Sequence, residues 1–150
     1  MLDADGSTNP REIPRFVAAL LDGNDFAKGS RFLPGGDSHD ITLLRRLGNF
    51  GLNNFVNMLF GTRFSDLCYG YNAFWRYCLS SVKVDCDGFE VETLINIRMH
   101  QLGWKIVEVS SVEHLRIYGA SNLDALRDGW RVLKTILRER GRNHPHIAQV

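Results

Sequence analysis

The stretch Met1-Leu2-Asp3-Ala4-Asp5-Gly6-Ser7-Thr8-Asn9 opens the chain, with two apolar residues ahead of two carboxylates that are one residue apart. If Met1 and Leu2 end a buried strand, Asp3 and Asp5 follow its carboxyl end, where ligands bind in open α/β sheets. Two carboxylates at that place can share a hard divalent cation, and Mg²⁺ completes its coordination with water and substrate phosphates. The stretch therefore favours an α/β fold with a metal–diphosphate site. A polar turn is the alternative, because Asp, Gly, Ser and Asn are all turn formers.

The composition is that of an ordinary globular domain. Of the 150 residues, 44% are hydrophobic and 23% are charged. The formal net charge of +1 gives no electrostatic argument for a nucleic-acid partner. Cys68, Cys78 and Cys86 have no metal-site or redox spacing, so we expect reduced thiols and a cytoplasmic protein. No apolar run has the length of a membrane span.

The apolar pattern of the rest of the chain predicts alternating helices and strands. Asn9 and Pro10 have the form of a helix start, and Pro14 predicts an irregular first turn. The expected elements are a helix to Leu21, a strand over 25–30, a helix over 41–60 capped by Asp40, a strand over 71–75, a helix over 88–102, a strand over 105–109 and a helix over 123–140 capped by Asn122.

Two helices carry broad apolar stripes. In the helix over 41–60 we expect a broad apolar stripe made of Leu44, Leu47, Leu52, Phe55, Val56, Leu59 and Phe60. Much of the remainder is occupied by Arg45, Arg46, Asn49, Asn53 and Asn57. Packing on the sheet explains such a stripe, and contact with a membrane surface is the sharper alternative. The final helix adds basic residues and Trp130 beside its own apolar stripe, a pattern that suits an anionic bilayer.

The domain interpretation follows from how little sequence precedes the first motif. Two residues do not make a strand, and a parallel sheet needs neighbouring strands. We therefore interpret residues 1–140 as the C-terminal portion of a larger α/β domain and expect residues 141–150 to be a disordered tail.

Five separated stretches resemble one family, in its order. They are LDADGSTNPREIP, KGSRFLPGG, LLRRLGNFGLNNFVNMLFG, DLCYGYNAFWR, and GFEVETLINIRMHQLGWKIVEV with RIYGASNL after it. The chain is similar to the family 2 glycosyltransferases, most of all to the polyprenyl-phosphate (dolichol-phosphate mannose synthase-like) branch. The resemblance implies a partial GT-A, Rossmann-like domain with a mixed sheet flanked by helices, lacking the family's first strands. It also implies a nucleotide-diphosphate sugar as donor.

The same resemblance assigns roles to the residues that bind the donor. Asp3 and Asp5 match the Asp-x-Asp that holds Mg²⁺ or Mn²⁺ with the ribose and diphosphate. Arg31, in Gly-Ser-Arg, matches an arginine near the phosphates. Arg45 and Asn49 match helix positions that face the same site.

Further matches concern the acceptor side and the closing loop. Tyr69-Gly70-Tyr71 stands where many relatives read Ser-Gly-Phe, on the acceptor side. Arg116 matches the arginine of a mobile loop that closes over the diphosphate. Relatives usually have Lys where this chain has Asn122, which removes one phosphate-binding charge.

The identity of the acceptor decides whether a base is needed. A polyprenyl phosphate is already anionic, whereas a hydroxyl acceptor must lose its proton to a carboxylate, for which Glu90 and Glu92 are the candidates. Both also suit a helix N-terminus as surface acids. We expect the lipid phosphate, and with it peripheral contact at the inner face of the membrane.

Two other functions remain open. A truncated transferase could be inactive or serve as a binding module. The opening motif also resembles haloacid dehalogenase-type phosphohydrolases, whose late acidic pair would have to be Asp124 and Asp128; these follow a helix cap here rather than a buried strand.

Overall fold

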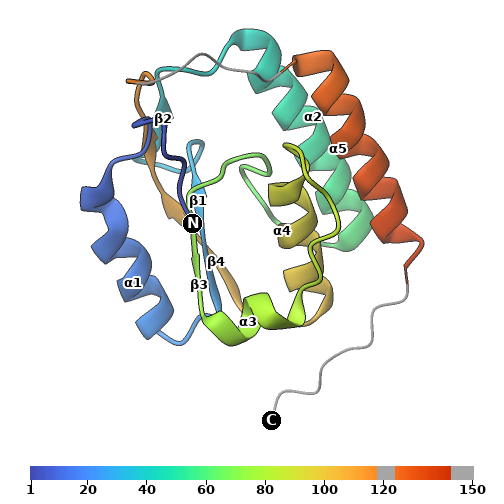
Figure 1. Ribbon diagram of the computed structural model, residues 1–150, viewed down its shortest axis with the longest axis horizontal. Helices are drawn as coiled ribbons and strands as arrows, with labels where there is room; N and C mark the ends of the chain where they lie inside the picture. Colours follow the sequence, from blue (N-terminus) through green and yellow to red (C-terminus); the bar gives the residue numbers. More distant parts are fainter. Residues whose placement is uncertain (118–123, 143–150) are drawn as a thin grey trace.

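The computed structural model describes residues 1–117 and 124–142. Helices and strands alternate along the chain (Figure 1). In order they are η1 (Pro10–Glu12), α1 (Ile13–Leu21), β1 (Phe26–Ser30), β2 (Asp37–Ser38), α2 (Leu43–Phe60), β3 (Asn72–Phe74), α3 (Arg76–Ser81), α4 (Val91–Gln101), β4 (Ile106–Ser110), β5 (Val112–Glu113) and α5 (Ala125–Arg140).

The central sheet is mixed. Its strand order is β3-β1-β4, with β1 parallel to β4 and antiparallel to β3. A second, two-stranded parallel sheet joins β2 to β5. The predicted α/β fold with a mixed sheet flanked by helices is confirmed, and it is consistent with a partial GT-A domain.

The opening residues lie against the outer edge of β3. The Met1 amine donates to the Asn72 carbonyl at 2.7 Å, and the Asn72 N–H donates to the Met1 carbonyl at 2.9 Å. Met1 and Leu2 are not assigned to a strand, so that part of the expectation is wrong in detail. The pairing nevertheless places Asp3 just beyond the point where the chain meets the sheet.

The two faces of the sheet are covered by different helices. In Figure 1, α1 lies on one side of the sheet and α4 on the other, and α5 packs against both α2 and α4. The alternation along β1 explains the layers, because successive side chains point to opposite faces. Ala27 packs with Phe16 of α1, whereas Phe26 belongs to a cluster with α3 and α4.

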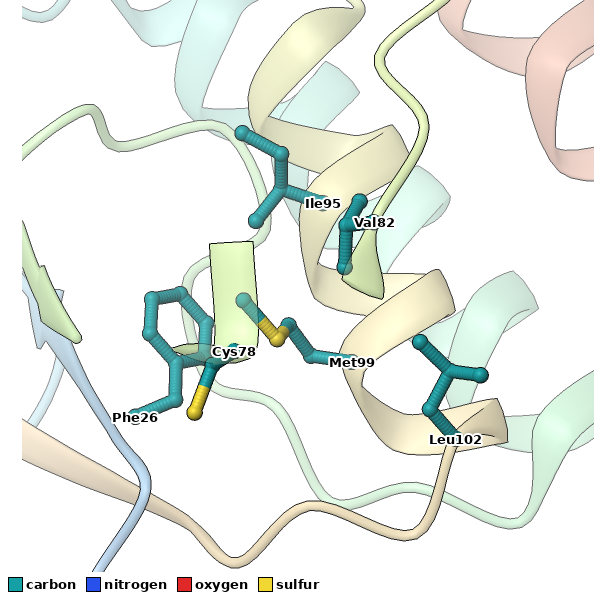
Figure 2. Close-up of a cluster of buried hydrophobic side chains, with 6 residues drawn as sticks. All are labelled: Phe26, Cys78, Val82, Ile95, Met99 and Leu102. Carbon is teal, nitrogen blue, oxygen red and sulfur yellow. The ribbon is translucent and has the colours of Figure 1, made fainter. Parts of the chain in front are cut away.

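Figure 2 shows the cluster around Phe26. Cys78 and Val82 from the α3 region and Ile95, Met99 and Leu102 from the α4 region close around the ring, all buried. This packing fixes α4 on the sheet, so that the first turn of α4 is held in a defined place. Cys68, Cys78 and Cys86 are free thiols, as expected.

Several helix ends differ from the prediction. Thr42, not Asp40, caps α2: its hydroxyl accepts from the Arg45 N–H at 3.3 Å. Asp124 caps α5, and Asn122 lies outside the described residues. The short helix α3 was not expected from the sequence. Asn9 does cap a helical start at Pro10, which is a 3₁₀ turn before α1, as Pro14 predicted.

Part of the apolar stripe expected for α2 packs inward: Leu52, Phe55, Leu59 and Phe60 lie against the core cluster that contains Val56. Asn49, Asn53 and Val56 are the buried residues of the helix, whereas Leu43 and Leu47 are 73% and 61% exposed. The Asn53 amide donates to the Phe64 carbonyl, so the loop that follows α2 provides a hydrogen-bond partner for this buried side chain. No helix in the described part of the chain is long and apolar enough to cross a bilayer.

Candidate active site

A pocket of ≈ 260 Å³ lies between the opening loop, α2, the segment before β3, and the N-terminal turns of α4 and α5. It gathers residues that are far apart in the sequence. The predicted residues that line it are Asp3, Arg31, Arg45, Asn49, Tyr69, Gly70, Glu92 and Arg116.

Two carboxylates meet at Gly70. A Cβ atom at this position would lie 3.3 Å from Asp3 Oδ2 and 3.5 Å from Glu92 Oε1. Burial, and then the nearby charge of Asp5, raises the pKa of Asp3. Burial, together with the charge of Asp3, raises the pKa of Glu92 to about 7. Gly70 thus leaves room for two acids that keep their protons more readily than usual.

Asp5 lies beside the pocket rather than in its lining. Its Oδ1 accepts from the Ser7 N–H at 2.9 Å, and its Oδ2 is 3.3 Å from Nη1 of Arg116. Slight burial works against the charge, but the Ser7 hydrogen bonds and Arg116 outweigh it and lower the pKa of Asp5. Asp5 is therefore an ionised carboxylate two residues from Asp3, which lines the pocket and is exposed to solvent.

The pair Asp3 and Asp5 fits a hard divalent cation. The described residues include no group of three or more His, Cys, Asp or Glu that could hold a metal. Mg²⁺ usually takes only one or two protein carboxylates and fills its other positions with water and phosphate oxygens. Two carboxylates on one loop, one of them facing the pocket, meet that requirement.

Arg116 and Arg45 share a carboxylate. Arg116 Nε donates to Asp40 Oδ2 at 3.1 Å, and Arg45 Nη1 is 3.9 Å from the same oxygen. Burial opposes the charge of Arg116, yet the hydrogen bond to Asp40 and the charges of Asp40 and Asp5 raise its pKa. Both guanidinium groups line the pocket.

The Arg31 guanidinium is held by two protein carboxylates. It donates to both carboxylate oxygens of Asp66 and, at 3.0 Å, to Glu113. Asn49 donates to the same Asp66 at 3.0 Å. Burial works against the charge of Asp66, but Arg31 outweighs it and lowers the pKa of this carboxyl. Arg31 and Asn49 line the pocket as parts of one buried network.

Two predicted residues point elsewhere. The Tyr71 ring stacks on Phe16 with centroids 4.4 Å apart, and its hydroxyl donates to the Asn9 carbonyl. Glu90 accepts from Arg131 at 2.9 Å and is not in the pocket lining. Of the two candidate bases, only Glu92 faces the pocket.

Sequence reasoning missed Asp40, Asp66 and Glu113. Asp66 stands inside a quoted motif, next to the acceptor-side residues, and a buried arginine requires carboxylate partners. Nothing in the spacing singles out Asp40 or Glu113 among the acidic residues, because both partners come from segments distant in sequence.

Known proteins resemble the chain over most of its length. Glycosyltransferase AglJ of Haloferax volcanii is 31% identical over 149 residues, which cover 97% of this chain and 48% of the relative. The polyprenol monophosphomannose synthase of Mycolicibacterium smegmatis is 31% identical over 125 residues, 81% of this chain and 47% of the relative. The undecaprenyl-phosphate mannosyltransferase of Micrococcus luteus is 29% identical over 111 residues, 72% of this chain and 45% of the relative.

This chain is a homologue of the polyprenyl-phosphate sugar transferases. The resemblance stated from the five motifs is confirmed. No family model matches the chain. The chain spans about half the length of the relatives named above.

Proposed function

We propose that this chain carries the diphosphate- and metal-binding part of a family 2 glycosyltransferase, which moves a sugar from a nucleotide diphosphate to a polyprenyl phosphate. The observation that supports this most is the convergence of Asp3, Arg45 and Arg116 on one pocket. These residues come from the opening loop, α2 and the segment after β5, so only the fold brings them together.

The reaction requires positive charge close to the departing diphosphate. In the transfer, an acceptor oxygen bonds to the anomeric carbon while the bond to the diphosphate oxygen breaks, and the diphosphate departs with the electron pair. Arg45 and Arg116 are placed to stabilise the charge that develops there. Asp3 and Asp5 would hold Mg²⁺ or Mn²⁺, which as a Lewis acid would neutralise the same charge.

The acceptor is proposed from charge and from the surface around the pocket. A lipid phosphate is an anion at neutral pH and needs no base. Leu44 and Leu126 line the pocket and are 59% and 78% exposed, so the pocket opens onto apolar surface. Leu43, Leu47 and Phe50 continue this surface along α2 at three- and four-residue spacing. We call these five residues the apolar face.

The apolar face supports peripheral contact with an anionic membrane. The homologues named above include an undecaprenyl-phosphate mannosyltransferase and a polyprenol monophosphomannose synthase. A polyprenyl chain lies in a bilayer. Contact between that bilayer and the exposed leucines beside the pocket would bring the lipid phosphate within reach of the pocket. Glu92 is the base to consider if the acceptor is a hydroxyl, since its pKa of about 7 suits proton transfer.

A transfer assay tests the proposal. The purified protein is incubated with Mn²⁺, a set of radiolabelled nucleotide-diphosphate sugars and a polyprenyl phosphate in detergent. We expect label in the lipid phase with one donor, and loss of that label in Asp5→Ala. Transfer to a soluble hydroxyl acceptor without transfer to the lipid would overturn the acceptor assignment. Phosphate release from a simple phosphomonoester would support the phosphohydrolase instead.

A further inference from the structure

Arg116 bridges two carboxylates at the entrance of the pocket. Its Nη1 is 3.3 Å from Asp5 Oδ2, and its Nε donates to Asp40 Oδ2 at 3.1 Å. Arg45 approaches the same Asp40 oxygen at 3.9 Å. The two arginines of the proposed diphosphate site are thus both paired with protein carboxylates.

These ion pairs are partly shielded from water. The side chains of Asp5, Asp40, Arg45 and Arg116 are each between 18% and 22% exposed. Attraction between charges in such a place is stronger than on an open surface, because the effective dielectric constant is lower. An incoming phosphate must therefore compete with Asp40 for the arginines.

In the part of the chain that the structure describes, the Asp40 carboxylate contacts Arg45 and Arg116. The sequence predicted Asp40 as the cap of α2, but Thr42 provides that cap. Asp40 is not part of the pocket lining, whereas both of its arginine partners are. Its carboxylate is the group that Arg45 and Arg116 have in common.

We propose that Asp40 is a positioning residue that restrains the diphosphate site: it holds Arg45 and Arg116 in ion pairs until ligand binding replaces them. Arg116 also pairs with Asp5 in this arrangement, so a cation held by Asp5 would compete with the arginine for that carboxylate. Diphosphate and cation then reinforce each other, because each removes a partner of Arg116. This inference rests on the proposed function of the same pocket.

Inorganic pyrophosphate, with and without Mn²⁺, is the probe. In wild-type protein we expect calorimetric titration to show weak pyrophosphate binding that Mn²⁺ strengthens. Asp40→Asn removes the competing charge and should tighten binding without metal by about fivefold, the equivalent of one partly exposed ion pair. The gain should shrink at high salt, because screening weakens the pairs that Asp40 makes.

Two controls separate this effect from a change in overall charge. Asp37→Asn makes the same charge change at an exposed residue of β2 and should leave pyrophosphate affinity unchanged. In a protein that already carries Arg116→Gln, Asp40→Asn should raise pyrophosphate affinity much less than it does in wild type, since Asp40 acts through the arginine.

The possible failures are distinct. If Asp40→Asn binds pyrophosphate no better than wild type while Mn²⁺ still strengthens binding in both, the role of Asp40 is wrong and the proposed function stands. An equal gain in Asp37→Asn would also overturn the role of Asp40. If no variant binds pyrophosphate with or without Mn²⁺, both the inference and the diphosphate site are wrong.

Discussion

The Arg31 guanidinium donates two hydrogen bonds to the Asp66 carboxylate, from Nε at 2.7 Å and from Nη2 at 3.0 Å, and both side chains are buried. The pair joins the end of β1 to the loop after α2, two segments that both border the pocket. It thereby ties the wall of the site to the central sheet.

Breaking this pair should destabilise the fold. Asp66→Asn leaves a buried arginine with Glu113 as its remaining carboxylate, and loss of one partner of a buried pair costs about 3 kcal/mol. Urea denaturation measures the change. Asp87→Asn is the control, because Asp87 pairs with Arg131 at the surface, where its side chain is 97% exposed. Equal stabilities of the two variants would contradict the role of the Arg31–Asp66 pair.

The charge of Asp3 should lower the stability of the fold and support metal binding. Its raised pKa means that the folded protein disfavours the charged form, so the ionised carboxylate reduces stability at pH 7. Asp3→Asn should raise the melting temperature only slightly, because Asp3 is exposed and water screens its charge. It should also weaken Mn²⁺ binding, measured by paramagnetic relaxation of water. Asp22→Asn, at the exposed end of α1, should change neither quantity. Unaltered Mn²⁺ affinity in Asp3→Asn would refute the metal assignment.

Glu92 should make stability depend on pH. Its pKa is about 7 in the folded protein against 4.5 as the ordinary value, so between these limits the folded state binds more protons than the unfolded chain. Stability contributed by this group is therefore full below pH 4.5 and is lost as the pH rises through 7. The loss amounts to at most about 3.5 kcal/mol, at about 1.4 kcal/mol for each pKa unit.

The measurement compares Glu92→Gln with wild type by denaturation from pH 4.5 to 8. We expect the variant to keep the stability that wild type loses over this range. Glu90→Gln is a poor substitute for Glu92→Gln, since Glu90 is paired with Arg131. Parallel pH profiles for Glu92→Gln and wild type would show that Glu92 ionises normally.

How far the sequence could predict this fold is seen in its strands and helix ends. The strands over 25–30 and 105–109 were expected, because short apolar segments between turn residues leave few alternatives. Glycines at 61 and 103 end α2 and the α4 segment, both at positive φ, as their positions predicted. Helix starts were less certain, because Asp40 and Thr42 are both good caps and only geometry decides between them.

The motifs assigned Asp3, Arg45 and Arg116 to one donor site, and these three residues line one pocket. The partners that hold such residues are harder to predict from sequence. The sequence could not show that Arg31 is enclosed by Asp66 and Glu113, since such pairs depend on the packing of distant segments. For α2 the sequence did not predict the exposure of Leu44 and Leu47, nor the burial of Asn53, whose amide donates to the Phe64 carbonyl in the loop that follows the helix.

The exposed apolar residues in the first half of α2 give the sharpest test of membrane contact. Basic residues of α5 are less suitable for the test, because Arg131 and Arg138 form ion pairs with Glu90 and Glu139. Leu47 and Phe50 of the apolar face are 61% and 68% exposed. Replacing exposed side chains there leaves the packed core untouched.

We expect the double variant Leu47→Asp, Phe50→Asp to bind anionic vesicles at least about tenfold more weakly than wild type. Burying a leucine or phenylalanine side chain in an apolar phase contributes roughly 1.5–3 kcal/mol, and the new carboxylates are repelled by anionic lipid. Co-sedimentation with phosphatidylserine-containing vesicles at low salt gives the measurement. Leu21→Asp is the matched control, because Leu21 is 72% exposed on α1, on the other side of the sheet. Equal loss of binding in Leu21→Asp, or none in the double variant, would exclude the apolar face as the membrane contact.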